Sequence, residues 1–448
     1  MSSRRTVLVA LTPITGHVRP AIPLVRALVA QGHDVVVYTG SKFADGIRAA
    51  GATAAPIVQG RDLDDALVDE WARERGAPPP GVKRLQWDVL HHFVEPVPGQ
   101  LADLSAIVAE TRPDVVVVDN ACIAGALAAR LHAVPCVLFS VTPLAVSSRD
   151  TAPFGTGLQP PRSRWDGLRY AALRWLVPHV VFRRAQRAAR GILRDVGLTP
   201  PPGFFMDWVQ AFADRVLHTS VPSMEYPRSD LPGNVELVGP FLPAAGDLSS
   251  VESQLPAWWP DVLAAHESGT PVVLVTQGTL ALDPDRLLWP AIEALAGEHV
   301  LVVATISSSD PGRVLPAGRP ANLRTASFVP FDRLLPLVDV MVTNGGFGGV
   351  QQALAAGVPL VVAGRSEDKA EVGARVQWSG AGVVLPTDRR TDATTAQAVR
   401  SGVGRVLADP RYRARAGELA REYARYDGVA RAVEVVEGLM SDEACAAV

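Results

Sequence analysis

Residues 341–362, "MVTNGGFGGVQQALAAGVPLVV", hold four glycines within five consecutive positions, between an apolar run and a helix-like segment. The run 338–342 is typical of a short buried strand, and residues 350–356 have the composition of a helix start. A strand, a glycine-rich turn and a helix leave unpaired N–H groups at the helix N-terminus, with no Cβ to keep a ligand away. The helix dipole favours a diphosphate there. The alternative is that the glycines only permit a tight turn with close helix–strand packing.

Two common phosphate-binding motifs are missing from this glycine loop. The dinucleotide motif requires a third glycine, but Gly346 and Gly348 are followed by Gln351. The P-loop requires a Gly-Lys-Ser/Thr sequence, and none follows. A phosphate site at this loop would therefore hold its ligand in a different way.

The length and composition indicate a globular protein of two to three domains. The 448 residues are 48% hydrophobic and 20% charged, and a net charge of −3 gives no reason to expect nucleic acid as a partner. Three cysteines form no metal-ligand or CxxC spacing, which fits a reducing cytoplasm. The N-terminal apolar run is too short for a signal peptide, and no stretch approaches the roughly 20 apolar residues of a membrane span. We therefore expect a cytoplasmic protein without stable membrane insertion.

One pattern occurs twice along the chain. Residues 6–39 and 271–305 each contain an apolar strand, a loop, a helix-like segment and a second apolar strand. Further Val- and Leu-rich strands follow in each half, and such continuous apolar strands belong to parallel sheets with helices on both faces. The stretch 229–250, rich in Pro, Gly and Ser, is the predicted linker region. The sequence thus predicts an α/β fold of two Rossmann-like, doubly wound domains that face each other across a ligand-binding cleft.

Four motifs, taken in order, give the chain a family resemblance. They are Gly16-His17-x-x-Pro20 after the first strand, "VVVVDN" at 115–120, "TQGT" at 276–279 and the "GGFGG…GVP…EDK" block in the second half. Together they resemble family 1 glycosyltransferases of the bacterial natural-product type, which have the GT-B fold and use UDP- or dTDP-sugars. The resemblance runs over nearly the whole chain, and the second-half block is its most specific part.

The resemblance assigns a role to each part of the chain. It implies an acceptor-binding N-terminal domain over residues 1–235 and a nucleotide-sugar-binding domain over 236–425. Residues 426–448 would form a C-terminal helix that packs back on the first domain.

His17 is the general base that the resemblance implies. An acceptor hydroxyl is a weak nucleophile at neutral pH, and a positioned base is worth about 100- to 10,000-fold in rate. An imidazole with a pKa near 6.5 is mostly neutral at physiological pH and can accept that proton. Asp119 matches the family's aspartate that orients the base and stabilises the imidazolium. Without the family, His17 would be interpreted as a structural loop histidine and Asp119 as a helix N-cap.

The resemblance also implies a donor site in the second domain, with departures from the family pattern. Asn344 stands where a histidine usually touches the diphosphate, Gln352 replaces a glutamate that holds the ribose, and Lys369 replaces a glutamine. Asp368 matches an acid that binds the sugar hydroxyls. Phe328 stands where a tryptophan often stacks on the base, although it could equally be a core aromatic. The implied donor-binding residues are Gly278, Thr279, Phe328, Val329, Asn344, Gly346, Phe347, Gly348, Gly349, Gln352, Asp368 and Lys369.

The acceptor is expected to be small and mostly apolar, and to bind in the first domain. The candidate acceptor residues are Ile14, His91, His92, Ser140 and Thr142. The stretch 162–194 carries nine arginines among large apolar side chains. It could lie on an anionic membrane and collect a lipid-type acceptor, or it could be a solvated helix face beside the acceptor pocket.

No metal or other cofactor is expected. Asp62 and Asp64, like Asp283 and Asp285, have the spacing of a metal-binding pair in other glycosyltransferases, but 46 acidic residues produce such pairs by chance. Backbone amides and helix dipoles can neutralise a leaving diphosphate without a divalent ion. The predicted function is inverting transfer of a hexose from a nucleoside-diphosphate sugar to an acceptor hydroxyl. The alternatives are a sugar-nucleotide epimerase and an inactive auxiliary protein of the same fold.

Overall fold

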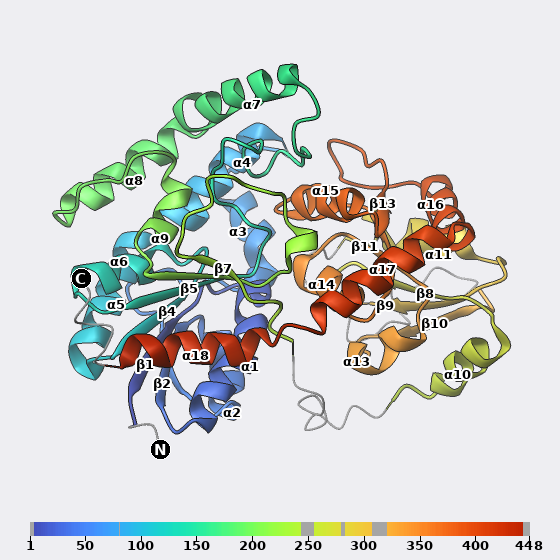
Figure 1. Ribbon diagram of the computed structural model, residues 1–448, viewed down its shortest axis with the longest axis horizontal. Helices are drawn as coiled ribbons and strands as arrows, with labels where there is room; N and C mark the ends of the chain where they lie inside the picture. Colours follow the sequence, from blue (N-terminus) through green and yellow to red (C-terminus); the bar gives the residue numbers. More distant parts are fainter. Residues whose placement is uncertain (1–3, 80, 243–254, 279–282, 307–319, 442–448) are drawn as a thin grey trace.

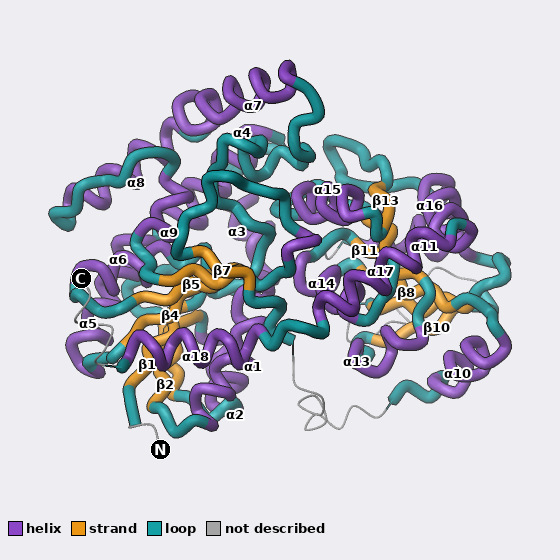
Figure 2. Tube along the Cα trace, viewed as in Figure 1, coloured by secondary structure: helices purple, strands orange, loops and turns teal. Residues whose placement is uncertain are grey.

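The computed structural model describes residues 4–79, 81–242, 255–278, 283–306 and 320–441. Within these ranges the strands form two separate parallel sheets, and each sheet lies between layers of helices (Figure 1, Figure 2). This arrangement confirms the predicted α/β class with two doubly wound domains.

The first sheet contains seven of the described strands, all parallel, in the order β3-β2-β1-β4-β5-β6-β7. Side chains alternate along β1, so that Val7 and Val9 enter one apolar cluster while Leu8 and Ala10 enter the cluster on the opposite face. The strand order reverses between β1 and β4, which is where ligands bind in such sheets. The strands are β1 Thr6–Ala10, β2 Asp34–Thr39, β3 Thr53–Pro56, β4 Val115–Asp119, β5 Cys136–Ser140, β6 Arg215–His218 and β7 Val235–Leu237.

Helices cover both faces of this sheet. The α-helices are α1 Thr15–Ala30, α2 Ala44–Ala49, α3 Val68–Glu74, α4 Val82–Asp88, α5 Val97–Thr111, α6 Ile123–Leu131, α7 Arg164–Leu176, α8 Arg183–Asp195 and α9 Trp208–Ala211. The short 3₁₀ segments are η1 Ser41–Phe43, η2 Asp65–Leu67, η5 Phe205–Asp207 and η6 Pro222–Met224, and the π segments are η3 Val89–Val94 and η4 Val177–Val181.

The second sheet contains six of the described strands, again all parallel, in the order β10-β9-β8-β11-β12-β13. Its order reverses between β8 and β11, so the glycine loop after β11 lies at this domain's ligand-binding edge. The strands are β8 Val272–Thr276, β9 Leu301–Thr305, β10 Leu323–Ala326, β11 Val340–Thr343, β12 Leu360–Val362 and β13 Gly382–Val384. The helices are α10 Trp259–Ser268, η7 Pro284–Arg286, α11 Leu288–Leu295, α13 Phe331–Leu334, η8 Leu335–Leu337, α14 Phe347–Ala355, α15 Lys369–Ser379, α16 Ala396–Ala408 and α17 Pro410–Tyr423.

The last helix, α18 (Gly428–Met440), lies on the first domain. Ala432, Val433 and Val436 belong to the same apolar cluster as Val7 and Val9 of β1. Figure 1 shows the chain leaving α17 in the second domain and placing α18 beside α1. The sequence places the domain boundary after residue 235, which falls inside the short strand β7. This strand pairs with β6 and belongs to the first sheet.

The first helix begins earlier than the sequence pattern indicates. The sequence pattern places His17 in the loop after the first strand, but α1 starts at Thr15 and contains both Pro20 and Pro23. Its first turn is stabilised from outside the helix, because the Thr15 N–H donates to Asp65 Oδ2 at 2.7 Å. His17 therefore lies in the first turn of a helix and not in a loop.

Candidate active site

His17 and Asp119 lie side by side at the edge of the first sheet where the strand order reverses. His17 follows β1 and Asp119 ends β4, and His17 Nδ1 is 2.7 Å from Asp119 Oδ1. A carboxylate can only accept a hydrogen bond, so Nδ1 carries the proton and Nε2 is left as the basic nitrogen. The His17 side chain is 13% exposed and that of Asp119 is fully buried. The pair therefore has the geometry of a general base with its orienting carboxylate.

Asp119 is held by more than His17. Thr12 donates to it through both its backbone N–H and its hydroxyl, and the Ala121 N–H donates to Oδ1 at 2.8 Å. Helix α6 starts only at Ile123, so the alternative that Asp119 is a helix N-cap is wrong. The sequence gives no signal for the contribution of Thr12, because its contact depends on the pairing of β1 with β4.

The two groups shift each other's ionisation. Burial disfavours the charged imidazolium, but the Asp119 carboxylate, its hydrogen bond and the nearby Asp368 outweigh this, so the pKa of His17 is raised. Burial also opposes the charge on Asp119, yet His17 and the N–H groups of Thr12 and Ala121 lower the pKa of Asp119. The arrangement favours an imidazolium beside a carboxylate, which is the state that forms after proton abstraction.

The raised pKa of His17 predicts the acid side of the pH–rate profile. A base works only when neutral, so kcat/KM should rise with pH through a midpoint above the ordinary value of about 6.5. Asp119→Asn removes the charge that raises the His17 pKa, so it should move this midpoint to lower pH while lowering the rate. A midpoint that stays in place in the Asn variant would show that the titrating group is not His17.

The glycine loop forms the matching edge of the second domain. Gly346 precedes the first residue of α14, and Gly345 has a φ of +91°, which an L side chain rarely adopts. A Cβ on Gly345 would lie 2.9 Å from Val362 Cγ1. The Phe347 side chain is buried, whereas Gly348 is exposed. The loop thus leaves the start of a nine-residue helix without bulky side chains, and binding of an anionic ligand there stays a prediction.

Asn344 supports this loop through its side chain. Its amide nitrogen donates to the backbone carbonyl of Gln277, and its Oδ1 accepts from the Gly346 N–H at 3.3 Å. The side chain is buried and ties the loops after β8 and β11 together. One of the two amide hydrogens of Asn344 is used in this way, so the predicted hydrogen bond to the diphosphate depends on the other.

Gly364 fixes the backbone of the same loop and offers a specific prediction. A Cβ on Gly364 would lie 2.2 Å from the Asn344 carbonyl oxygen. Gly364→Ala should destabilise the protein by about 1–3 kcal/mol and displace the loop, and the displaced loop should bind the nucleotide more weakly. Isothermal titration with a nucleoside diphosphate measures this loss. Gly404→Ala is the control, because a Cβ there meets nothing within 4 Å, and equal affinities in both variants would contradict the prediction.

Asp368 and Lys369 begin α15 beside the glycine loop. Burial, followed by the neighbouring Glu367, raises the pKa of Asp368 to about 6, while Lys369 and His17 act in the opposite direction. His17 and Asp368 are therefore close enough to affect each other's charge across the two domains. Lys369 Nζ donates to Glu367 Oε2 at 2.7 Å, and its Cβ lies close to Gly345. The sequence does not indicate that Glu367 neutralises this lysine.

The other predicted donor residues occupy varied positions. Phe328 is 50% exposed, so the alternative that it is a core aromatic is wrong, and stacking on a base stays a prediction. Val329 is buried, and its backbone contact with the base also stays a prediction. Gln352 donates to Gly348 O at 3.3 Å from a half-buried position on α14. Gly278 follows β8 with a φ of +76°. Thr279 lies outside the described residues.

The predicted acceptor residues form two groups. Ile14 follows β1, Ser140 is the last residue of β5, and Thr142 follows that strand. The Ser140 hydroxyl donates to Thr142 O at 2.9 Å, and Thr142 Oγ1 accepts from Asn120 Nδ2 at 3.0 Å. These hydroxyls stabilise the loop after β5, and their contact with an acceptor stays a prediction.

His91 and His92 belong to an aromatic cluster that the sequence does not show. His92 lies 5.0 Å from the Trp71 ring, and Trp87 lies 4.4 Å from His91. The Arg61 guanidinium stacks over Trp71 at 4.4 Å. Burial and the nearby arginines lower the pKa of His92 to about 4, so His92 is neutral at physiological pH. His92 does not lie on an open helix surface, since its side chain is only 12% exposed.

The acidic pairs with metal-like spacing have ordinary structural roles. Asp62 accepts from the Ser41 N–H, Asp64 binds Lys42 and caps η2, and Asp283 caps η7. No group of three or more metal-ligating side chains occurs in the part of the chain that the structure describes.

A buried charge network that the sequence does not reveal joins the two domains. Arg375 of α15 donates to Glu225 Oε2 and to Glu371 Oε2, each at 2.9 Å. Glu225 also lies 2.8 Å from His218 Nε2, and Glu371 accepts from the N–H groups of Gly155 and Gly157. Residues from both domains therefore meet in one network on α15, the helix that begins directly after Asp368.

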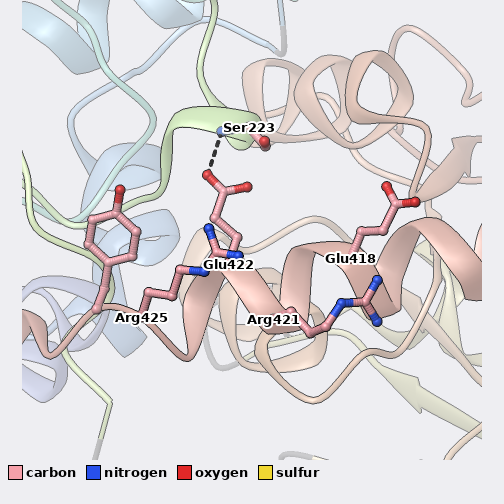
Figure 3. A pocket seen from close by; sticks show the side chains of 6 residues that line it. Ser223, Glu418, Arg421, Glu422 and Arg425 are labelled. Atoms are coloured by element: carbon pink, nitrogen blue, oxygen red, sulfur yellow. Dashed lines mark hydrogen bonds between the residues drawn. The ribbon is translucent and has the colours of Figure 1, made fainter.

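A second contact between the domains borders a cavity of about 590 Å³. The Ser223 N–H donates to Glu422 Oε1 of α17 at 3.1 Å, as Figure 3 shows. The cavity is lined by charged side chains of α17 and by none of the predicted site residues. It is a crevice of the interface and not the candidate active site.

Comparison with known proteins places this geometry in context. Residues 291–439 match the family described as "Erythromycin biosynthesis protein CIII-like, C-terminal domain". The chain is 42% identical to 4'-demethylrebeccamycin synthase of Lentzea aerocolonigenes over 97% of this chain and 99% of that protein. It is 32% identical to UDP-glycosyltransferase 2 of Phaeomoniella chlamydospora over 97% of this chain and 95% of that protein.

Among solved structures, the calicheamicin glycosyltransferase CalG4 superposes with a TM-score of 0.74 at 24% identity, covering 98% of both chains. The spinosyn rhamnosyltransferase SpnG, in complex with thymidine diphosphate, superposes with a TM-score of 0.68 at 21% identity, over 96% of this chain and all of that one. These likenesses show a shared two-domain fold.

Proposed function

Because the chain belongs to the family 1 natural-product glycosyltransferases, enzymes of the GT-B fold, we propose that it is an inverting hexosyltransferase. The donor is a nucleoside-diphosphate sugar, and the acceptor is a hydroxyl of a small, mostly apolar molecule. His17 is the general base, assisted by Asp119. The observation that carries the proposal is the buried 2.7 Å contact between His17 and Asp119 at the sheet edge, with Asp368 of the other domain close to it.

The mechanism follows from this arrangement. The acceptor O–H gives its proton to His17 Nε2 while the oxygen attacks the anomeric carbon from the side opposite the diphosphate. A single displacement of this kind inverts the configuration at that carbon. Asp119 stabilises the imidazolium that forms, without taking the proton itself. The bond to the diphosphate breaks, and its charge is taken up by the N–H groups at the start of α14 and the helix dipole.

The donor base is either uracil or thymine. The relative from Phaeomoniella chlamydospora is named a UDP-glycosyltransferase, and SpnG was solved with thymidine diphosphate, which supports both nucleotides. Phe328, half exposed, would stack on the base, while Asp368 would accept hydrogen bonds from sugar hydroxyls.

The experiment that tests the function has two stages. A thermal-shift screen against UDP- and dTDP-sugars identifies the donor, because a ligand that binds only the folded state raises the melting temperature. Product analysis by mass spectrometry then compares the donor alone with the donor plus a panel of apolar hydroxyl compounds. Sugar transfer only with acceptor supports the proposal. Conversion of the donor alone would show an epimerase, and binding without any turnover would show an auxiliary protein.

Removal of divalent cations should leave transfer unchanged. The amides and dipole of α14 are proposed to offset the diphosphate charge, so EDTA should alter the rate by less than about twofold. Initial rates with EDTA, and with EDTA followed by excess Mg²⁺, measure this directly. Loss of activity that Mg²⁺ restores would refute the metal-independent mechanism.

A further inference from the structure

Helix α7 exposes an apolar stripe to solvent. Trp165 is 80% exposed, Leu168 63% and Trp175 61%, and Leu176 and Val180 continue the stripe into η4. The spacing of these residues places them on one side of the helix. The opposite side holds α7 to the domain, because Tyr170 is buried and donates to Gln159 O at 2.8 Å. Several large apolar side chains exposed together on one side of a helix indicate an interaction site.

The same segment is strongly basic. Residues 162–194 contain nine arginines and one acidic residue, Asp166, in a chain whose net charge is −3. Helix α8 buries Ala185, Ala189 and Leu193 and presents its arginines outward. Its exposed arginines are Arg183, Arg184, Arg187, Arg190 and Arg194. Figure 1 shows α7 and α8 following each other along one outer edge of the N-terminal domain.

These properties select one kind of partner. Tryptophan rings are favoured at the boundary between lipid headgroups and acyl chains, and arginines pair with lipid phosphates. A symmetric contact with a second copy would set one arginine-rich patch against its twin, which like-charge repulsion opposes. Within the described ranges, no helix combines the length and hydropathy required to cross a bilayer.

We propose that the α7–η4–α8 edge, residues 164–195, docks on the surface of an anionic lipid bilayer. Helix α7 lies in the plane of the interface with Trp165 and Trp175 at the headgroup level, and the α8 arginines bind lipid phosphates. The loop before α7 carries Gly155 and Gly157, which bind Glu371 of the second domain, so docking presents the acceptor domain to the bilayer next to the domain junction. An apolar acceptor dissolved in the bilayer thus reaches the enzyme without crossing water.

Vesicle flotation with the full chain tests the proposal. The probes are vesicles of phosphatidylcholine alone and of phosphatidylcholine with phosphatidylglycerol. The protein should bind only the anionic vesicles, and binding should weaken with salt. Arg187→Gln with Arg190→Gln should weaken binding about 25-fold, since each surface arginine contributes about fivefold. Arg389→Gln with Arg390→Gln is the control, because it removes two exposed arginines from the other domain and should have little effect.

The apolar stripe is tested separately. Trp165→Ala with Trp175→Ala should abolish flotation but leave the melting temperature, nucleotide binding and turnover of a water-soluble acceptor unchanged, because both side chains are exposed. These readouts also separate failure of docking from failure of the proposed function. Equal binding to neutral and anionic vesicles would overturn the proposal. So would full binding by the Arg187→Gln, Arg190→Gln variant or by the Trp165→Ala, Trp175→Ala variant. Two further results would also overturn the proposal. One is a dimer in sedimentation velocity that is lost in the tryptophan variant, and the other is binding to polyglutamate without binding to vesicles.

Discussion

Replacing His17 with alanine is expected to lower kcat by about 100- to 10,000-fold, the range that a positioned general base contributes. The buried Asp119 stays satisfied in this variant through Thr12 and the Ala121 N–H, so the fold should survive. Binding of the nucleotide should also persist, because the glycine loop belongs to the other domain. Initial rates and isothermal titration of the same preparation separate the two effects.

His299→Ala is the matched control, since this histidine is exposed and belongs to no predicted site. It should retain full activity. Near-normal turnover of His17→Ala would remove His17 from the mechanism, and so would a loss of nucleotide affinity as large as the loss of rate.

Replacing Arg375 with methionine is expected to destabilise the protein by about 3–5 kcal/mol, the cost of breaking a buried ion pair by removing one partner. Arg375 is 1% exposed, and its removal leaves the carboxylates of Glu225 and Glu371 without their cation. Burial opposes ionisation of Glu225, but Arg375 and His218 together hold the pKa of Glu225 well below its usual range. Thermal unfolding should therefore occur several degrees lower in the variant.

Arg413→Met provides the comparison. Arg413 forms a 2.8 Å ion pair with Asp339 in which both side chains are partly exposed, so its loss should cost less than about 1 kcal/mol. The transfer rate is a second readout, because Arg375 joins α15, which begins beside Asp368, to the first domain. Equal melting temperatures of the two variants would contradict the importance of the network.

Much of the candidate site could be predicted because its signals are local. Gly345 and Gly346 directly precede α14, Gly348 and Gly349 lie in its first turn, and the end of the β4 strand places Asp119 at a sheet edge. The start of α1 could not be predicted, since its first N–H is satisfied by Asp65, fifty residues away. The structural role of Asn344 was equally hidden, because its partner Gln277 lies in another loop.

The sequence by itself determined the two doubly wound domains, because unbroken apolar strands that alternate with helices can be buried only in parallel sheets with helices on both faces. The tertiary structure alone decided which residues from the two domains meet. Arg375 lies 150 positions from Glu225, and no local pattern records that contact. Such contacts depend on how the finished domains pack, and the free energy of that packing is spread over many weak interactions that no short stretch of sequence contains.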